Sequence, residues 1–186
     1  HAIDGFHGNE HALPIVPLYK DVVELMAQSG ITYTPTLLVA YGGPWGENFY
    51  YTTEEVHDDP KVQRFIPDNI IQARTRRRPW FRKDEHVFSK LAAQAAKIIR
   101  AGGLVGVGAH GQFQGLGYHW ELWSLHSGGM TEIEALRAAT LNGAKIIGVG
   151  NDVGSIESGK LADMVILDKN PLVNIRNTNT VKYVMK

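Results

Sequence analysis

The sequence has 186 residues, of which 44% are hydrophobic, so the chain carries enough apolar side chains to bury a sizeable core. Its 19 lysine and arginine residues balance 19 aspartate and glutamate residues, which removes the electrostatic reason to expect a nucleic acid or an anionic membrane as partner. The absence of cysteine excludes disulfides, thiolate metal sites and a cysteine nucleophile. No apolar run approaches the roughly 20 residues that span a bilayer. A soluble protein is therefore expected, with cytoplasmic, periplasmic and secreted locations left open. The start at His1 instead of methionine indicates a processed, trimmed or cloned segment.

The first forty residues alternate between helix and strand signals. Residues 1–16 are expected to form a loop or short strand. Pro17 suits the first turn of a helix, and Gly30 suits the end of that helix. Ile31–Ala40 is rich in β-branched residues and predicts a strand. The order helix, glycine, strand is typical of an α/β fold with parallel strands.

Residues 41–60 combine glycines with aromatic side chains, among them Tyr41 and Trp45. We expect a long loop here, directly after the predicted strand. Long loops in compact domains tend to be lids or binding loops, and a packed surface excursion is the alternative.

The remaining chain predicts further helices and then a small β element. Helices are expected over 61–78 with an interruption at Pro67, and over 86–101, 119–127, 131–141 and 142–149. Thr131 and Glu134 have the spacing of a capping box, which marks a helix start. Strands are expected at 104–109, with the sequence LVGVGA, at 162–167 and at 181–185. We place a boundary near residue 150.

Histidines are the main indication of chemistry. His11 and His110 stand at the ends of predicted strands, and His119 begins the predicted helix that follows. An α/β barrel places catalytic and metal-binding groups at the C-terminal ends of its parallel strands. Neutral imidazole is also the commonest metal ligand in proteins. We therefore predict that His11 and His110 are catalytic and metal-binding residues, with a purely structural role as the alternative.

Three other kinds of site do not fit the sequence. His7 and His11 have the four-residue spacing of a metalloprotease helix, but Gly8 stands where that motif requires glutamate. No GxSxG motif occurs, so a serine hydrolase of the α/β type is unsupported. The glycine-rich stretch 102–108 lacks the lysine and serine or threonine of a phosphate-binding loop.

Two segments of the C-terminal half resemble the amidohydrolase superfamily. They are Met130–Ala144, MTEIEALRAATLNGA, and Gly154–Asp168, GSIESGKLADMVILD. The second fits the pattern GxIxxGKxADxVxLD. The triplet Asn9-Glu10-His11 resembles the element of the sixth barrel strand whose histidine binds metal. The nearest subgroup looks like the imidazolonepropionase- and prolidase-related hydrolases, which include forms fused to a β-propeller.

This resemblance implies an α/β fold that corresponds to the C-terminal part of a TIM-type (β/α)8 barrel. Strands six to eight and their helices would occupy residues 1–150, and residues 151–186 would form a β-strand segment of a small composite β-sandwich. The family's first-strand His-x-His pair, fourth-strand lysine or glutamate and fifth-strand histidine have no counterpart. His110 stands where members usually carry an aspartate that binds metal and acts as general base. Three parallel strands cannot close a barrel, so we expect a homo-oligomer or association with the missing barrel strands.

The activity that the resemblance implies is that of a metal-dependent hydrolase, which cleaves amide or ester bonds in a small-molecule substrate. The cofactor would be a divalent metal, with zinc favoured because the available ligands are imidazoles. Substrate contacts are expected from Tyr41, Trp45, Gln112 and His119. Two alternatives stay open. One is a metal-free ester hydrolase that uses a histidine–carboxylate pair, such as His119 with Glu121 or His110 with a neighbouring acid. The other is a non-catalytic remnant that functions only in an assembly.

Overall fold

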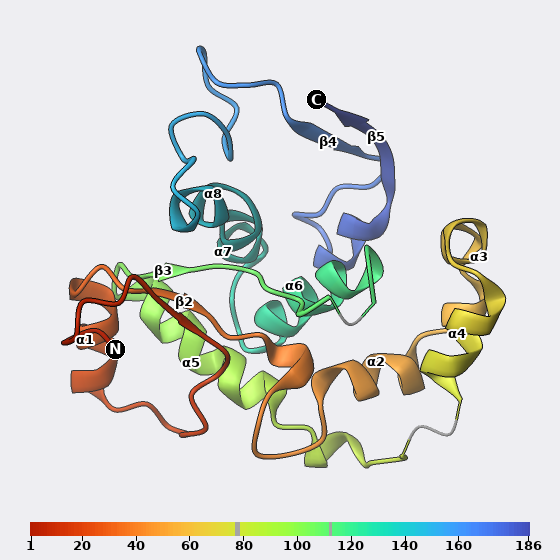
Figure 1. Ribbon diagram of the computed structural model, residues 1–186, viewed down its shortest axis with the longest axis horizontal. Coiled ribbons are helices and arrows are strands. Elements are labelled where there is room, and N and C mark those ends of the chain that lie inside the picture. The colour runs from red at the N-terminus through yellow and green to blue at the C-terminus, as the bar shows by residue number, and fades with distance from the viewer. Residues whose placement is uncertain (77–78, 112) are drawn as a thin grey trace.

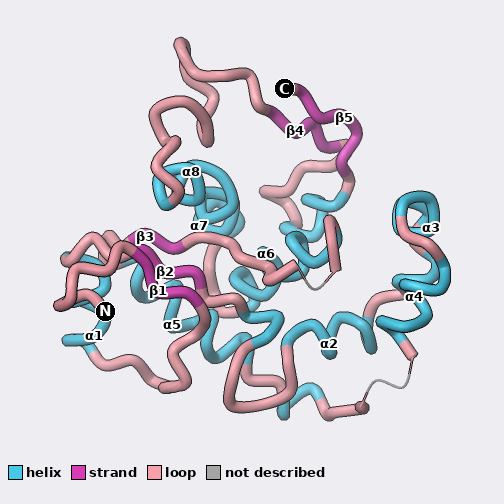
Figure 2. The backbone as a smooth tube through the Cα atoms, viewed as in Figure 1, coloured by secondary structure: helices cyan, strands magenta, loops and turns pink. Residues whose placement is uncertain are grey.

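The computed structural model describes residues 1–76, 79–111 and 113–186, and it shows an α/β protein with two separate sheets (Figure 1). A parallel sheet contains β1 (Gly8–Glu10), β2 (Thr32–Thr34) and β3 (Leu104–Val105), in that order. An antiparallel hairpin pairs β4 (Met164–Leu167) with β5 (Val181–Met185). Helices α6 to α8 lie between the two sheets (Figure 2). The predicted α/β class is therefore confirmed.

Helices form most of the connections. They are α1 (Lys20–Gln28), α2 (Gly46–Thr53), α3 (Pro60–Phe65), α4 (Asp68–Thr75), α5 (Phe88–Arg100), α6 (Leu116–Ser127), α7 (Glu132–Arg137) and α8 (Gly143–Ile146). Gly30 has a φ of +75° directly after α1, as expected of a residue that ends a helix. The predicted break at Pro67 is confirmed, because it separates α3 from α4.

The parallel strands are much shorter than predicted. The expected strand Ile31–Ala40 ends at Thr34, because Pro35 has no N–H for the ladder and Thr36 adopts a left-handed conformation. A 3₁₀ turn, Leu37–Val39, follows. The expected strand 104–109 ends at Val105. No further strand pairs with the outer edge of β3 within residues 1–76, 79–111 and 113–186, so nothing there extends its ladder.

The prediction of a long loop over residues 41–60 is wrong for most of its length. Helix α2 and a 3₁₀ turn at Val56–Asp58 occupy this segment. Gly46 allows the close packing at the start of α2, because a Cβ there would lie 2.6 Å from the Leu37 carbonyl oxygen. The aromatic residues of α2 then pack inward: the Tyr50 ring stacks on Trp120, with centroids 5.3 Å apart. Tertiary packing therefore overrides the local glycine signal.

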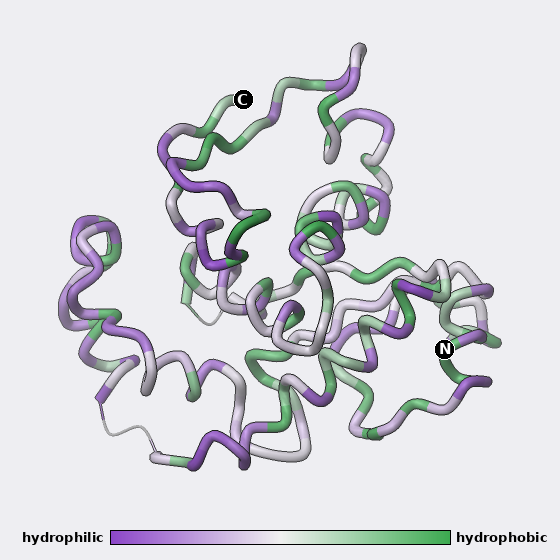
Figure 3. Tube along the Cα trace, turned by 180° about the vertical axis from the view of Figure 1, so that it is seen from behind, coloured by the Kyte–Doolittle hydropathy of each residue, from purple (hydrophilic) through white to green (hydrophobic). Residues whose placement is uncertain are grey.

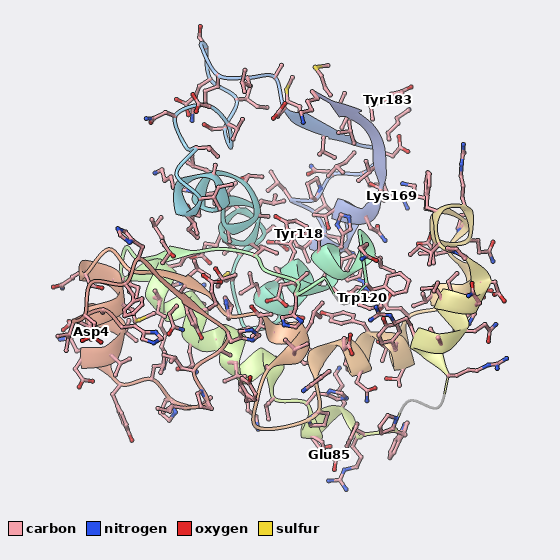
Figure 4. All side chains as sticks on the ribbon, viewed as in Figure 1. Asp4, Glu85, Tyr118, Trp120, Lys169 and Tyr183 are labelled. Carbon is pink, nitrogen blue, oxygen red and sulfur yellow. The ribbon has the colours of Figure 1, made fainter. Side chains whose placement is uncertain are left out.

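Helix α6 forms the centre of the core. Trp120 is fully buried and lies in the middle of the molecule (Figure 4). Its ring packs against Tyr50, Tyr51 and Phe113, with centroid distances of 5.1–5.7 Å. The helix starts at Leu116, three residues before the predicted start at His119. A helix surrounded in this way has no solvent-facing stripe, which explains why its apolar residues show no simple helical period.

One almost continuous helical segment runs from Glu132 to Ile146. The predicted capping box is present: the Thr131 hydroxyl accepts from the Glu134 N–H at 3.2 Å, and the Glu134 carboxylate accepts from the Thr131 N–H at 2.8 Å. A π-helical turn, Ala138–Asn142, joins α7 to α8. The two helices that were predicted over 131–149 are therefore joined, and they end at Ile146.

The C-terminal hairpin is thinly covered. Side chains on both strands are exposed, including Val165, Tyr183 and Val184, and Figure 4 shows Tyr183 projecting outward. Seen from behind, hydrophobic residues mark this hairpin, whereas the α3–α4 arm is mostly hydrophilic (Figure 3). None of the helices in the described ranges is long and apolar enough to cross a membrane.

Candidate active site at the strand ends

A strained residue follows each of the three parallel strands: one residue after β1, two after β2 and five after β3. His11, Thr36 and His110 are the three non-glycine residues with positive φ in the described part of the chain, at 68°, 53° and 57°. Left-handed backbone is unfavourable for residues with a Cβ, and for β-branched threonine it is a genuine outlier. Such strain persists only where the surroundings hold it, and it clusters at functional sites. The C-terminal edge of the sheet is therefore the place to look for chemistry.

His11 follows β1 directly and is fastened by its backbone. Its N–H donates to the Thr34 carbonyl at 2.8 Å, and its carbonyl accepts from the Asn9 side-chain amide at 3.2 Å. The imidazole is half-buried, and its Nδ1 atom has no hydrogen-bond partner in the structure. A buried ring nitrogen without a protein partner is costly, so it needs a water molecule, a ligand or a catalytic role.

His110 reaches the same place from β3. Its ring and that of His11 have centroids 5.3 Å apart in an edge-on arrangement. Gly108 makes this approach possible, because a Cβ at that position would lie 2.4 Å from Thr34 Cγ2. His110 is exposed to solvent. The two imidazoles that the sequence singled out, 99 positions apart in the chain (110 minus 11), thus lie side by side.

The four residues predicted to contact substrate lie in different places. Tyr41 is next to the pair, with its ring 6.2 Å from that of His11 and 59% of its surface exposed. Trp45 precedes α2 and is half-exposed. Gln112 lies outside the described residues. His119 points elsewhere, because its Nδ1 lies 3.2 Å from the Thr178 hydroxyl. Burial lowers the pKa of His119, and positive Lys61 adds to this effect.

The predicted pairing of His119 with Glu121 is wrong. Residues two apart on a helix point in different directions. Glu121 is fully buried on the opposite side of α6, where its carboxylate accepts from the backbone N–H groups of Leu37 and Leu38 at 2.7 and 3.0 Å. Burial raises the pKa of Glu121 to about 8, and the two backbone hydrogen bonds act against this rise. The sequence shows a carboxylate in an apolar helix, but it does not show which backbone segment that carboxylate binds.

A cavity of about 950 Å³ borders the strand ends, where Glu10 and Thr34 line it. It extends past the segment after β3 to α6, α8 and β4, with Val107, His119 and Met164 among its lining residues. Its wall is predominantly apolar, and it contains neither His11 nor His110. Size alone therefore does not mark the chemically equipped part of this molecule.

The two imidazoles can be tested for their fit to a metal ion. Within residues 1–76, 79–111 and 113–186, no three histidine, aspartate or glutamate side chains are grouped so as to hold a metal ion. Two imidazoles on one tetrahedral zinc, with Zn–N distances of about 2.1 Å, would place their ring centres roughly 5 Å apart. The observed 5.3 Å and the unpartnered His11 Nδ1 fit a shared ion. In such a site the two imidazoles would supply two of the four ligands.

Comparisons with known proteins bear on the family and the fold of this chain. The profile of the amidohydrolase family matches residues 1–186. Imidazolonepropionase from Syntrophobacter fumaroxidans is 56% identical over 46 residues, which is 24% of this chain and 11% of that protein. A solved Xaa-Pro dipeptidase with bound methionine matches all of this chain and 39% of its own, with 23% identity and a TM-score of 0.62. The ochratoxinase of A. niger matches with 25% identity and a TM-score of 0.61, over 100% of this chain and 36% of its own. The chain thus spans about two fifths of the length of these solved structures.

Proposed function

Because this chain belongs to the amidohydrolase family, we propose that it carries part of the active site of a hydrolase that cleaves carbon–nitrogen amide bonds or esters in small molecules. The observation that carries the proposal is the pairing of His11 with His110, which follow β1 and β3, the two outer strands of the parallel sheet. Strained backbone and an unpartnered buried nitrogen at the same place support a chemical role over a structural one. Neither imidazole is among the described residues that line the cavity of about 950 Å³.

Members of this family generally depend on a divalent metal, and the imidazole pair suits one. His11 and His110 would hold the ion, and zinc is favoured because both ligands are nitrogen donors. A bound divalent ion supplies Lewis-acid polarisation of the carbonyl in the scissile bond. Catalytic zinc usually has three protein ligands, so a further ligand would come from outside the described residues.

The chain's own residues then divide the remaining tasks. An imidazole that ligates through one nitrogen carries its proton on the other, so it can donate a hydrogen bond but cannot act as general base. In the role of ligand, His110 would therefore orient the substrate, and a different group would accept the proton of the attacking water. Tyr41 would provide an aromatic wall beside His11, and Trp45 is the second candidate for such a wall.

The same proposal covers the wider architecture. Residues 1–150 would form strands six to eight of a (β/α)8 barrel, and residues 151–186 would contribute to a small composite β-sandwich. Both outer edges of the parallel sheet, on β1 and β3, lack a strand partner in the described chain. Open edges expose unpaired N–H and C=O groups, so they favour pairing with further strands or with a second copy.

The test is hydrolysis by the wild-type chain with and without a chelator, together with elemental analysis. Substrates would be small activated esters, anilides and Xaa-Pro dipeptides, the last suggested by the name of one structural relative. We expect chelation and His110→Ala to lower hydrolysis at least about 100-fold, because even changes outside the ligand shell cost about 10- to 100-fold. His57→Ala is the matched control, since this histidine is exposed, its ring bonds the Thr75 hydroxyl, and it lies in the 3₁₀ turn Val56–Asp58. Activity that survives both chelation and His110→Ala would refute the metal mechanism.

A further inference from the structure

The turn after β2 has no local cap. The first N–H groups of a helix lack intrahelical partners, and a serine, threonine or aspartate before the helix usually supplies one. Thr36 precedes the 3₁₀ turn Leu37–Val39, yet its side chain caps none of these groups. The Leu37 and Leu38 side chains are fully buried, so water is a poor substitute. Each unsatisfied buried N–H would cost about 1–3 kcal/mol.

Glu121 supplies the missing cap from a distant part of the chain. Its two carboxylate oxygens each accept one of these N–H groups, at 2.7 Å from Leu37 and 3.0 Å from Leu38. The donors and the acceptor are 84 and 83 residues apart. The centre of α6 is thereby fixed to the turn that ends β2.

The clamped turn begins at the strained Thr36. A β-branched residue at a φ of 53° needs external support, and the capped N–H of Leu37 is the next backbone group along the chain. The Thr36 hydroxyl in turn donates to the Thr34 carbonyl at 3.2 Å. The geometry of Thr36 and the position of the Thr34 carbonyl are therefore set together.

Both imidazoles depend on this same spot. The Thr34 carbonyl that binds the Thr36 hydroxyl also accepts from the His11 N–H at 2.8 Å. On the other side, Gly108 lies so close to Thr34 Cγ2 that no side chain would fit between them, and His110 follows two residues later. A shift of the turn after β2 would therefore displace His11 and His110 relative to each other.

We propose that Glu121 is a positioning residue of the active site, whose buried carboxylate clamps the turn after β2 and thereby holds the His11 and His110 rings together. This inference rests on the proposed function for its significance, but its geometry can be tested without metal or substrate. Because the pKa of Glu121 is about 8, its carboxyl is ionised above that pH, and the spectra below are recorded there. The ionised carboxylate serves better here than an amide, because glutamine offers one oxygen and one NH₂ group to two N–H donors.

Ser124 provides the control for a merely structural effect. It is also fully buried on α6, and its hydroxyl bonds Tyr50 and the Trp120 carbonyl at 3.0 and 2.8 Å. Within the described residues, none of its hydrogen bonds reaches the turn after β2. Loss of this hydroxyl therefore weakens the core around α6 without releasing the clamp.

The experiment measures nuclear Overhauser cross-peaks between the ring protons of His11 and His110 in the full chain labelled with ¹³C-histidine. Signals are assigned from their loss in His11→Ala and His110→Ala. We expect a cross-peak in the wild type, and we expect its intensity to fall about threefold or more in Glu121→Gln. An unsupported site loosens by roughly 1 Å, and the intensity falls with the sixth power of the distance between the protons. Ser124→Ala should retain the wild-type intensity.

Three results would overturn the proposal: no cross-peak in the wild type, an unchanged cross-peak in Glu121→Gln, or an equal loss in Ser124→Ala. Thr36→Gly is the second variant in case Glu121→Gln fails to fold. Glycine leaves no buried N–H unpaired but frees the strained turn, so a smaller loss of the same cross-peak is expected, and an unchanged one counts against the clamp. A chain that holds the rings together yet hydrolyses nothing would refute the proposed function and leave this inference intact.

Discussion

The strand-end region and the C-terminal hairpin of this protein differ in how much of their structure and role the local sequence indicates. The hairpin region carries the most recognisable motif, Gly154–Asp168, but many side chains on its two strands are exposed. The strand ends carry short, unremarkable segments, yet they bring together two imidazoles, a buried carboxylate and three strained residues. The family is thus easiest to identify from the hairpin region, whereas the candidate catalytic groups lie at the strand ends.

The motif is recognisable because its interactions are local. The Lys160 ammonium donates to the Gly150 carbonyl at 2.7 Å and to the Ser155 hydroxyl at 2.6 Å. Gly154, with a φ of +94°, lies so close to Ala144 that a Cβ would approach its methyl group to 2.6 Å. These contacts join residues at most about ten positions apart, so the motif can be read as a continuous string. The strand-end cluster joins residues up to 99 positions apart (110 minus 11) and leaves no such string.

The difference in packing predicts the largest change in stability. Trp120→Ala should lower the free energy of unfolding by about 3–5 kcal/mol, because a large aromatic side chain is removed from a closed core. Val184→Ala on the hairpin should change it by no more than about 0.5 kcal/mol, because Val184 is 73% exposed. Urea unfolding of both variants checks this. Equal losses would mean that the hairpin is covered in solution, for instance by a second copy.

The sequence predicted the α/β class, the helix break at Pro67, the capping box at Thr131 and the hairpin strands. Each of these depends on residues close together in the chain. The errors arose where distant residues decide. Aromatic residues of 41–60 lie in a helix that packs against Trp120. Glu121 points away from His119, and its carboxylate caps the turn after β2. His11 and His110 were found because strand ends converge in parallel sheets, which is a rule of topology and not of local pattern.

A second prediction distinguishes the two regions by pH. The pKa of Glu121 is raised from 4.5 to about 8, so its stabilising contribution is complete below pH 4.5 and is lost as the pH rises through 8. Relative to Glu121→Gln, the wild-type free energy of unfolding should fall between pH 5 and pH 8.5, by about 2–4 kcal/mol at roughly 1.4 kcal/mol per unit.

Other groups near Glu121 do not obscure this window. The pKa of Tyr33 is raised to about 12 by burial, and burial also raises that of Tyr50, so both phenols stay neutral throughout. Chemical denaturation at intervals of half a pH unit measures the difference. A difference between wild type and Glu121→Gln that does not change with pH would show that this carboxyl keeps an ordinary pKa. A hairpin variant such as Asp168→Asn should show no change in the same window.

The smallest predicted effect compares two surface ion pairs, one on each region. Arg100 donates two hydrogen bonds to Glu134, at 3.0 and 2.9 Å, and Glu134 also closes the capping box of α7. Lys182 and Asp168 meet at 3.2 Å on the hairpin with about half of each side chain exposed. Glu134→Gln should cost about 0.5–1 kcal/mol at pH 7, after allowance for solvent screening, because it weakens a cap and an ion pair together. Asp168→Asn should cost less than about 0.5 kcal/mol, because water screens an exposed pair.

The two pairs also respond differently to acid. Hydrogen bonds from Arg100 are the main cause that lowers the pKa of Glu134 from 4.5 to about 2. A lowered carboxyl pKa means that its stabilisation is present above pH 4.5 and is lost as the pH falls towards 2. The stability cost of Glu134→Gln should therefore shrink over that interval. The cost of Asp168→Asn is already small, so it should change little with pH. If the costs of both substitutions shrink in parallel as the pH falls, the Lys182–Asp168 pair is as well formed as the Arg100–Glu134 pair. The proposed difference in packing between the helical region and the hairpin would then be wrong.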